Sequence, residues 1–248
     1  PTPPDYIPAL SAQGPYITPF VITDSSQFCS PGPPALSSRE YAVDLEETKI
    51  LGSKTSTERT EEQTEIAVFW TGGAGTIIHW NLIACNVAAA ESTFEELVQL
   101  LCLMNLAIAD AVITTWYDKY RFNLWRPITA IREAETDGNP LTIGDPSWEP
   151  LLDTPPFPEH TSAHSAVSGT ASRILALFFN NNGIRFSICS PALNGIERSF
   201  KGFSEAANEA ARSRIYCGHH FGFSSKRGLA EGLNICDYIW KQMINACG

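Results

Sequence analysis

The sequence is poor in basic residues and has no long uninterrupted apolar run. Of its 248 residues, 17 are Lys or Arg and 27 are Asp or Glu, which gives a formal net charge of −10 at pH 7. A strongly acidic chain repels nucleic acid and anionic membranes, so we expect neither as the main partner. No stretch of about 18 or more consecutive apolar residues occurs, so we predict no membrane span.

The seven cysteines lack the spacing of a zinc site or of a redox motif. No Cys-x-x-Cys pair occurs, and the odd number leaves at least one thiol unpaired. Cys29 and Cys189 lie in loop-like sequence and are the better candidates for a disulfide. There is no Asn-x-Ser/Thr acceptor, signal peptide or initiator Met, and the chain opens on Pro1-Thr2-Pro3-Pro4. We therefore expect a processed or truncated soluble chain, and its compartment stays open, secretion included.

The composition supports a sizeable core, with 44% hydrophobic residues, thirteen Phe and six Trp. Residues 1–36 are Pro-rich and aperiodic, which predicts an extended arm packed on a single domain formed by residues 37–248. Apolar residues in that domain recur at helical spacing, and strand-type alternation is almost absent. We predict an all-α fold, a bundle of about seven helices over 38–51, 56–70, 76–90, 92–116, 164–180, 203–218 and 225–244.

A candidate site lies just before the helix predicted over 164–180. A proline-rich run precedes it and cannot continue a helix backwards, so the helix should begin near Thr161 or Ser162. The first turn then offers unpaired backbone N–H groups, the Ser162 hydroxyl and the His164 imidazole, which suit anion binding and proton transfer. A plainer interpretation takes Ser162 as a simple N-cap and His164 as a core histidine.

Basic residues gather in two further motifs, although the chain has few of them. Lys119 precedes Arg126 by seven positions, and the proline after Arg126 should bend the chain so that both side chains reach one pocket. Arg214 precedes His220 by six positions, and Gly218 can end a helix and turn His220 back. A plainer interpretation of the Gly-His-His run is a helix C-terminus whose imidazoles stabilise the dipole. Guanidinium and ammonium groups around one pocket suit a tetrahedral oxyanion.

The three motifs together resemble those of the vanadium-dependent haloperoxidases. They read Lys-(six residues)-Arg-Pro, Pro-x-x-x-Ser-x-His and Ser-Arg-(five residues)-His, in that order, and the resemblance extends from about Trp116 to Gly232. This family shares its fold and anion pocket with the type 2 phosphatidic acid phosphatase superfamily. The resemblance implies a vanadate cofactor in a site that phosphate also fits. It also implies oxidation of halide by hydrogen peroxide to hypohalous acid, with a small organic acceptor.

The resemblance also implies roles for single residues. His220 would coordinate vanadium, His164 would take a proton from hydrogen peroxide as catalytic base, and Lys119 would be catalytic as a hydrogen-bond donor to the bound peroxide. Trp116 and Phe157 would line the halide side. The vanadate oxygens would be bound by Lys119, Arg126, Ser162, the backbone N–H of Ala163, and Arg214.

Several residues near the motifs depart from the family pattern or have no assigned role. Ala163 stands where Gly is commoner. Ser224 stands four positions after His220, where many superfamily members have an acid, so support for His220 must come from elsewhere. Glu159 and Asp153 are interpreted as solvated loop charges. The sequence assigns no place to His160, and it favours a core position for His79.

Two other functions compete with the haloperoxidase hypothesis. An acid phosphatase would use the same pocket, with His220 forming a phosphohistidine and His164 protonating the leaving group. An inactive anion-binding or structural module is the third hypothesis. If part of the protein is missing from this chain, exposed apolar faces predict a homodimer.

Overall fold

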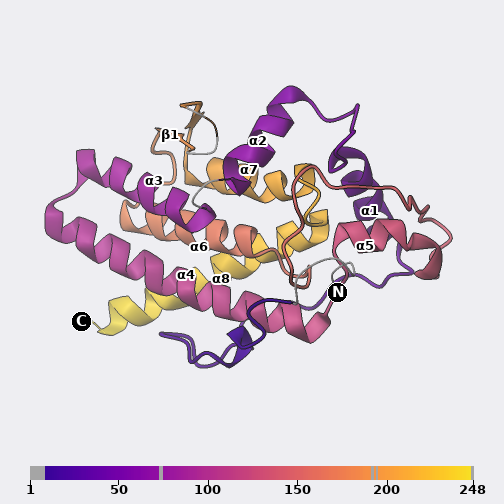
Figure 1. The fold of residues 1–248 in the computed structure, drawn as a ribbon. Helices are drawn as coiled ribbons and strands as arrows, with labels where there is room; N and C mark the ends of the chain where they lie inside the picture. Colours follow the sequence, from indigo (N-terminus) through magenta and orange to yellow (C-terminus); the bar gives the residue numbers. More distant parts are fainter. Residues whose placement is uncertain (1–8, 73–74, 191–192, 194, 247–248) are drawn as a thin grey trace.

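The computed structural model describes residues 9–72, 75–190, 193 and 195–246. They form a helical bundle with one small antiparallel sheet, and the all-α prediction is confirmed (Figure 1). The helices are α1 (Arg39–Leu51), α2 (Glu61–Thr71), α3 (Thr76–Glu91), α4 (Phe94–Phe122), α5 (Pro127–Arg132), α6 (Ala163–Phe178), α7 (Phe203–Tyr216) and α8 (Gly222–Ala246), with 3-10 turns η1 (Gly14–Tyr16) and η2 (Ala134–Thr136).

Helix α6 lies at the centre and packs against α4, α7 and α8. Figure 1 shows α4, α6 and α8 running beside one another through the bundle. The core between the helices contains fully buried large side chains such as Trp70, Trp80 and Phe203. Helix α8 approaches α6 very closely, because a Cβ on Gly232 would lie 2.1 Å from the Ala166 carbonyl oxygen. This close packing fixes the start of α6, where the candidate site lies.

The first turns of the helices follow capping signals in the sequence. Ser38 caps α1 as expected, its hydroxyl accepting the Tyr41 N–H. Helix α2 begins at Glu61, not at residue 56, because Thr60 and Gln63 form a capping box. The preceding turn is held by Arg59, whose Nη1 donates to the carbonyls of residues 51 and 53 at 2.6 Å each.

Helix α4 is longer than predicted and carries part of the first motif. Its N-cap is Thr93 in a capping box, one residue after the expected cap, and it runs to Phe122, not to Trp116. It ends at Asn123 in the left-handed conformation, with φ 48°. Lys119 therefore lies on the last turn of this helix. The short helix α5 that follows was not predicted, and it starts on a proline at its first position.

A small hairpin was missed by the search for strand patterns. Strands β1 (Phe186–Cys189) and β2 (Glu197–Phe200) pair antiparallel, with Phe186 opposite Phe200. The Phe186 ring also stacks on Phe203 at 5.7 Å between centroids. The hairpin thus covers the start of α7, and four-residue strands are too short to show a clear period of two.

One segment has the apolar character of a membrane span, which was not expected from the sequence. Phe94–Arg132 is long and apolar enough to cross a membrane by length and composition alone. The central helix of a folded core passes the same test, and α4 here packs against α6 and α8.

None of the described cysteines forms a disulfide, the two candidates Cys29 and Cys189 included. The six described cysteines, 29, 85, 102, 189, 217 and 236, are all free thiols, and Cys247 lies outside the described residues. The Cys29 sulfur accepts a hydrogen bond from Arg121 beside the end of α4. Cys189 lies at the end of β1, so the two candidates belong to different parts of the bundle.

The described part of the N-terminal region, residues 9–36, lies against α4. The buried Asp110 carboxylate accepts the backbone N–H groups of residues 20–22 at 2.7, 2.8 and 2.9 Å. Asp118 accepts the Ser30 N–H at 2.9 Å. Residues 1–8 lie outside the described part, so an arm over 1–36 and a domain over 37–248 stay predictions.

Apolar side chains are exposed on the outer face of the α3–α4 pair. They are Ile77, Ile78 and Leu82 of α3 and Phe94 and Val98 of α4. Such a face is compatible with a homodimer, which stays a prediction.

Candidate active site

Arg126 joins the three sequence motifs in space. Its Nε donates to the Phe157 carbonyl at 2.8 Å, and its Nη1 donates to the His219 carbonyl at 2.8 Å. Nη1 also lies 2.9 Å from His220 Nε2. The predicted convergence of these segments is therefore present at Arg126. The Nη2 atom is buried and has no hydrogen-bond partner among the described residues.

Arg214 is a second buried guanidinium with an unused donor. Its Nη1 donates to Thr71 Oγ1 at 2.5 Å and its Nη2 to His219 Nδ1 at 2.7 Å. His219 Nδ1 must accept, because Arg only donates, so His219 Nε2 carries a proton and donates to the Leu152 carbonyl at 3.0 Å. Both ring nitrogens of His219 are thus engaged. The Nε of Arg214 has no partner in the described structure.

The turn after α7 brings His220 back over Arg214. Gly218 has φ +77°, and a Cβ there would lie 2.7 Å from the Gly52 carbonyl oxygen, so only glycine fits. The backbone N–H groups of His219 and His220 both donate to the Arg214 carbonyl, at 3.0 and 3.1 Å. This is the reversal that the sequence predicted for Gly218.

Glu159 is the residue that the sequence interpretation placed wrongly. It is fully buried, not solvated, and its Oε1 lies 2.8 Å from His220 Nδ1 and accepts the Phe221 N–H at 3.0 Å. Burial raises the pKa of Glu159 to about 7, although Arg126 and Lys119 act to lower it. Glu159 lies inside the second motif, and the residue four positions after His220 is not an acid. These two facts together could have indicated Glu159 as the carboxylate partner of His220.

The Lys119 ammonium is held by the loop that precedes α6. Its Nζ donates to the carbonyls of Pro158 at 3.2 Å, Glu159 at 3.0 Å and Thr161 at 2.5 Å. These three bonds account for all three ammonium protons. Burial, followed by the charge of Arg126, holds the pKa of Lys119 well below its usual range. A bound anion would have to replace one of the carbonyls.

The start of α6 presents a hydroxyl, a backbone donor and an imidazole. Ser162 is its N-cap, and Ser162 Oγ accepts from the Ser165 N–H at 3.4 Å and from Ser165 Oγ at 2.9 Å, which leaves its own proton free. Ala163 is the first residue of the helix, where a backbone N–H has no intrahelical partner. His164 Nε2 is buried without a partner in the described part of the chain. Burial, and then the Arg214 charge, hold the pKa of His164 well below its usual range.

Two aromatic rings stand beside the basic groups. Trp116 and Phe157 meet edge to face with centroids 4.7 Å apart. The Phe157 ring lies 5.3 Å from Lys119 Nζ and 4.8 Å from Arg126 Cζ, so cations stand close to it. Trp116 is packed by the N-terminal region, since a Cβ on Gly14 would lie 2.8 Å from its Cβ. The two residues expected on the halide side are thus adjacent to Lys119.

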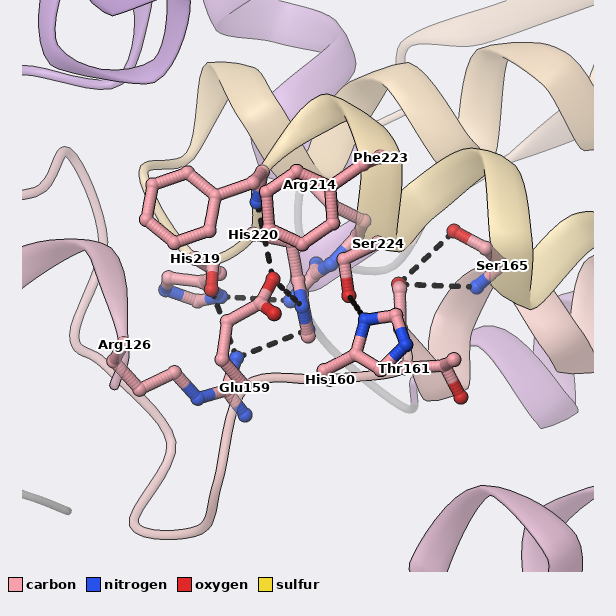
Figure 2. A network of polar contacts seen from close by, with 12 residues as sticks. Arg126, Glu159, His160, Thr161, Ser165, Arg214, His219, His220, Phe223 and Ser224 are labelled. Carbon is pink, nitrogen blue, oxygen red and sulfur yellow. Dashed lines mark hydrogen bonds and ion pairs between the residues drawn. The ribbon is translucent and has the colours of Figure 1, made fainter. Parts of the chain in front are cut away.

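The other residues of the sequence analysis lie away from this pocket. His160 is turned toward Ser30 Oγ, 2.8 Å from its Nε2, and toward Ser224 Oγ, 3.2 Å from its Nδ1. Figure 2 shows the Glu159 carboxylate pointing to His220 while the neighbouring His160 ring points to Ser224. His79 is a buried core residue and Asp153 is exposed, as predicted.

A second buried carboxylate, Glu231 on α8, was not singled out in the sequence. It accepts from Thr161 Oγ1 at 3.0 Å and from Thr115 Oγ1 at 3.2 Å. Burial, followed by the neighbouring Asp118, raises the pKa of Glu231 well above its usual range. Glu231 therefore fixes Thr161 through its hydroxyl, and the carbonyl of Thr161 in turn accepts a hydrogen bond from the Lys119 ammonium. An amphipathic helix pattern alone gives no signal for such a role.

The donor set of the pocket fits a tetrahedral oxyanion. Three basic side chains, Lys119, Arg126 and Arg214, are buried here, and the charges of the buried Glu159 and Glu231 carboxylates act on Lys119. Unpaired buried charge is costly, and Arg126 Nη2 and Arg214 Nε still lack partners within the described residues. An anion with several oxygens would satisfy both guanidinium groups, and vanadate and phosphate both have this form.

The chain is thus a helical bundle that buries a cluster of basic side chains with donors suited to an oxyanion. A family model described as the VCPO second helical-bundle domain matches residues 99–247. The match covers more than half of the chain, which therefore belongs to the vanadium chloroperoxidase (VCPO) family.

Individual relatives agree with this assignment. The chain is 27% identical over 183 residues to the vanadium chloroperoxidase of Curvularia inaequalis, which is 59% of this chain and 29% of that protein. It matches the crystal structure of a bacterial vanadium-dependent iodoperoxidase with a TM-score of 0.85 and 34% identity, over 97% of this chain and 59% of the other.

A more distant structure shows the same fold. A holo-type bacterial vanadium-dependent chloroperoxidase matches with a TM-score of 0.76 and 18% identity, over 94% of this chain and 54% of the other. The chain therefore spans less than two thirds of the length of each of these relatives.

Proposed function

We propose that the chain binds vanadate in this pocket and uses it to oxidise halide with hydrogen peroxide to hypohalous acid, which a small organic molecule then accepts. The observation that carries the proposal is a set of buried polar atoms without partners in the described residues: Arg126 Nη2, Arg214 Nε and His164 Nε2. Two of them are donors for an oxyanion, and the third is a nitrogen suited to proton transfer. The family membership and the relatives named above support the same reading.

The residues around the pocket supply distinct contacts for the anion. Arg126 Nη2 and Arg214 Nε donate to its oxygens, as do the free hydroxyl proton of Ser162 and the backbone N–H of Ala163. His220 offers Nε2, which lies 2.9 Å from Arg126 Nη1 at the edge of the pocket. The Arg126, Arg214 and Ser162 side chains are buried in the bundle before any anion arrives, whereas His220 Nε2 would exchange its contact with Arg126 for the anion.

The chemistry follows from the charge state of the pocket. Bound vanadium would act as a Lewis acid without changing its redox state. His164 is neutral, since its pKa is held well below the usual range by burial and Arg214, so its unpaired Nε2 can take a proton from hydrogen peroxide. Lys119 would exchange its longest bond, 3.2 Å to the Pro158 carbonyl, for a bond to the reacting oxygen. Phe157 and Trp116 would keep water from the halide side.

An acid phosphatase is the second candidate, and one contact favours it. A carboxylate 2.8 Å from His220 Nδ1 supports an imidazole that attacks through Nε2, as formation of a phosphohistidine requires. Phosphate has the tetrahedral form that the guanidinium groups fit. His164 would then donate a proton to the leaving group.

One experiment separates the two functions. The protein is reconstituted with vanadate, and halogenation of a phenol-type dye with peroxide is measured with iodide, bromide and chloride in parallel. Hydrolysis of para-nitrophenyl phosphate is measured without vanadate. Halogenation that is lost in His220→Ala supports the haloperoxidase, and the rates with the three halides test whether the Phe157 ring favours chloride. Phosphatase activity alone supports the second candidate, and silence in both assays contradicts both.

A further inference from the structure

We propose that Glu159 is a positioning residue that holds the His220 ring through its Nδ1–H, so that the Nε2 lone pair stays directed at Arg126 and the basic groups beside it. The inference deepens the proposed function, and it rests on that function only where vanadate is the bound anion. The same lone pair would serve a phosphohistidine, so the positioning role itself holds for either chemistry.

The hydrogen bonds around the His220 ring determine where its proton lies. Arg126 Nη1 stands 2.9 Å from Nε2, and a guanidinium has only N–H groups, so Nε2 must accept. A neutral imidazole has a single N–H, which is therefore on Nδ1. That N–H donates to Glu159 Oε1 at 2.8 Å. The His220 side chain is 3% exposed and that of Glu159 is 0% exposed, so bulk water does not compete for either group.

Glu159 is itself held rigidly, as a positioning residue must be. Its Oε1 also accepts the Phe221 N–H at 3.0 Å, so one oxygen fixes both the ring of residue 220 and the backbone that follows it. The backbone N–H of Glu159 donates to the Leu124 carbonyl at 3.1 Å, and its carbonyl accepts from Lys119. Figure 2 shows the carboxylate reaching across from its loop to His220. The loop before α6 thus determines the orientation of an imidazole that follows α7.

No other described acceptor takes the place of this carboxylate. Ser224, four residues after His220, is paired with His160 Nδ1 at 3.2 Å. The adjacent His219 is engaged by Arg214 and the Leu152 carbonyl. A carboxylate on the outer nitrogen of an imidazole raises the basicity of the inner one, and loss of such support typically weakens ligand affinity about 10–100-fold.

The first test is the protonation pattern of the ring, which needs no bound anion. Nitrogen-15 NMR of labelled protein, assigned with His220→Gln, should show Nδ1 protonated and Nε2 unprotonated. Glu159→Leu removes the acceptor of the Nδ1–H, so the Nδ1 resonance should shift and its proton should exchange faster with water. Asp44→Asn is the matched control, because Asp44 of α1 is also a buried carboxylate, and it accepts the Phe223 N–H at the start of α8 without touching the ring. A protonated Nε2 in the wild type, or an unchanged Nδ1 resonance and proton exchange rate in Glu159→Leu, overturns the proposal.

The second test is affinity, and it uses a variant that keeps the shape of the site. Glu159→Gln retains an acceptor oxygen for Nδ1, so it should keep the position of the ring and fold even where Glu159→Leu does not. Its affinity for inorganic vanadate by isothermal titration calorimetry should fall by about 10–100-fold, since the charge is lost. Asp44→Asn should bind as the wild type does. Affinity of Glu159→Gln within about twofold of the wild type contradicts the proposal.

The two proposals fail in different ways. If the wild type has the expected tautomer but does not bind vanadate or halogenate the dye, the positioning role stands and the haloperoxidase assignment falls. If the wild type halogenates and Glu159→Gln binds vanadate unchanged, the function stands and the role of Glu159 falls.

Discussion

Replacing Arg126 by Lys tests whether the pocket binds an oxyanion through its unpaired guanidinium nitrogen. Arg126 Nε and Nη1 are taken by two backbone carbonyls, and only Nη2 lacks a described partner. A lysine has a single nitrogen, and donating to the carbonyls of Phe157 and His219 would hold that nitrogen away from the position of Nη2. The donor to the anion is then lost while a positive charge is kept.

The size of the effect follows from that single bond. A hydrogen bond to a charged group contributes about 1.5–3 kcal/mol, and 1.4 kcal/mol corresponds to tenfold in affinity. Phosphate and vanadate should therefore bind about 10–150-fold more weakly to Arg126→Lys. Isothermal titration calorimetry with each inorganic anion measures this directly, without turnover.

Arg121→Lys is the matched control for this experiment. Arg121 is exposed near the end of α4, just before Arg126 in the chain. Its guanidinium lies over Tyr117 and Phe122 at 5.8 and 5.2 Å, so the anion should bind as in the wild type. A folded Arg126→Lys protein that binds phosphate within about twofold of the wild type would refute the reasoning. An equal loss in Arg121→Lys would do the same, because it would point to net charge and not to the pocket.

Three further outcomes are expected. Gly14→Ala should displace Trp116, because the added Cβ would lie 2.8 Å from the Trp116 Cβ. The kcat/KM for halide should then fall by roughly 10–100-fold while the affinity for vanadate is unchanged. Unchanged steady-state kinetics would show that Trp116 does not shape the halide side. Anion binding should be accompanied by proton uptake, because burial and Arg126 lower the pKa of Lys119 and the negative charge of a bound anion raises it again. The affinity for the anion should therefore fall as the pH rises through the Lys119 pKa of the free protein. Titration calorimetry in two buffers of different ionisation enthalpy measures the protons taken up, and proton release would contradict the prediction. Gly218→Ala should lower the unfolding free energy by about 1–3 kcal/mol in urea denaturation, since φ is +77° there, and full stability would mean that the turn can rearrange.

The features of the fold that the sequence predicted correctly depend on residues that are close together in the chain. Helix starts depend on neighbouring residues, so the Ser38 cap and the α6 start at Ser162 could be read directly. The length of α4 and the β1–β2 hairpin were missed, because both depend on packing against distant segments. The all-α class survived these errors, since helical periodicity dominates most of the chain.

Some features of the candidate site could likewise be predicted from the sequence, and others could not. The convergence of the motifs at Arg126 was predictable, because motif spacing and Gly218 define the bend and the reversal. The burial of Glu159 was not, since a charged residue in a proline-rich loop is usually solvated and only the tertiary fold places it against His220. The capture of all three Lys119 protons by loop carbonyls likewise has no sequence signal.

The carboxylates of α4 make the N-terminal region a part of the folded structure, although its proline-rich composition suggests a loosely attached arm. Asp110 and Asp118 are fully buried, and their backbone donors come from residues 20–22 and Ser30. Removing the proline-rich N-terminal residues for crystallisation would leave both buried carboxylates of α4 without these donors. Proteolytic cleavage within residues 20–30 should accordingly lower the stability of the whole helical bundle.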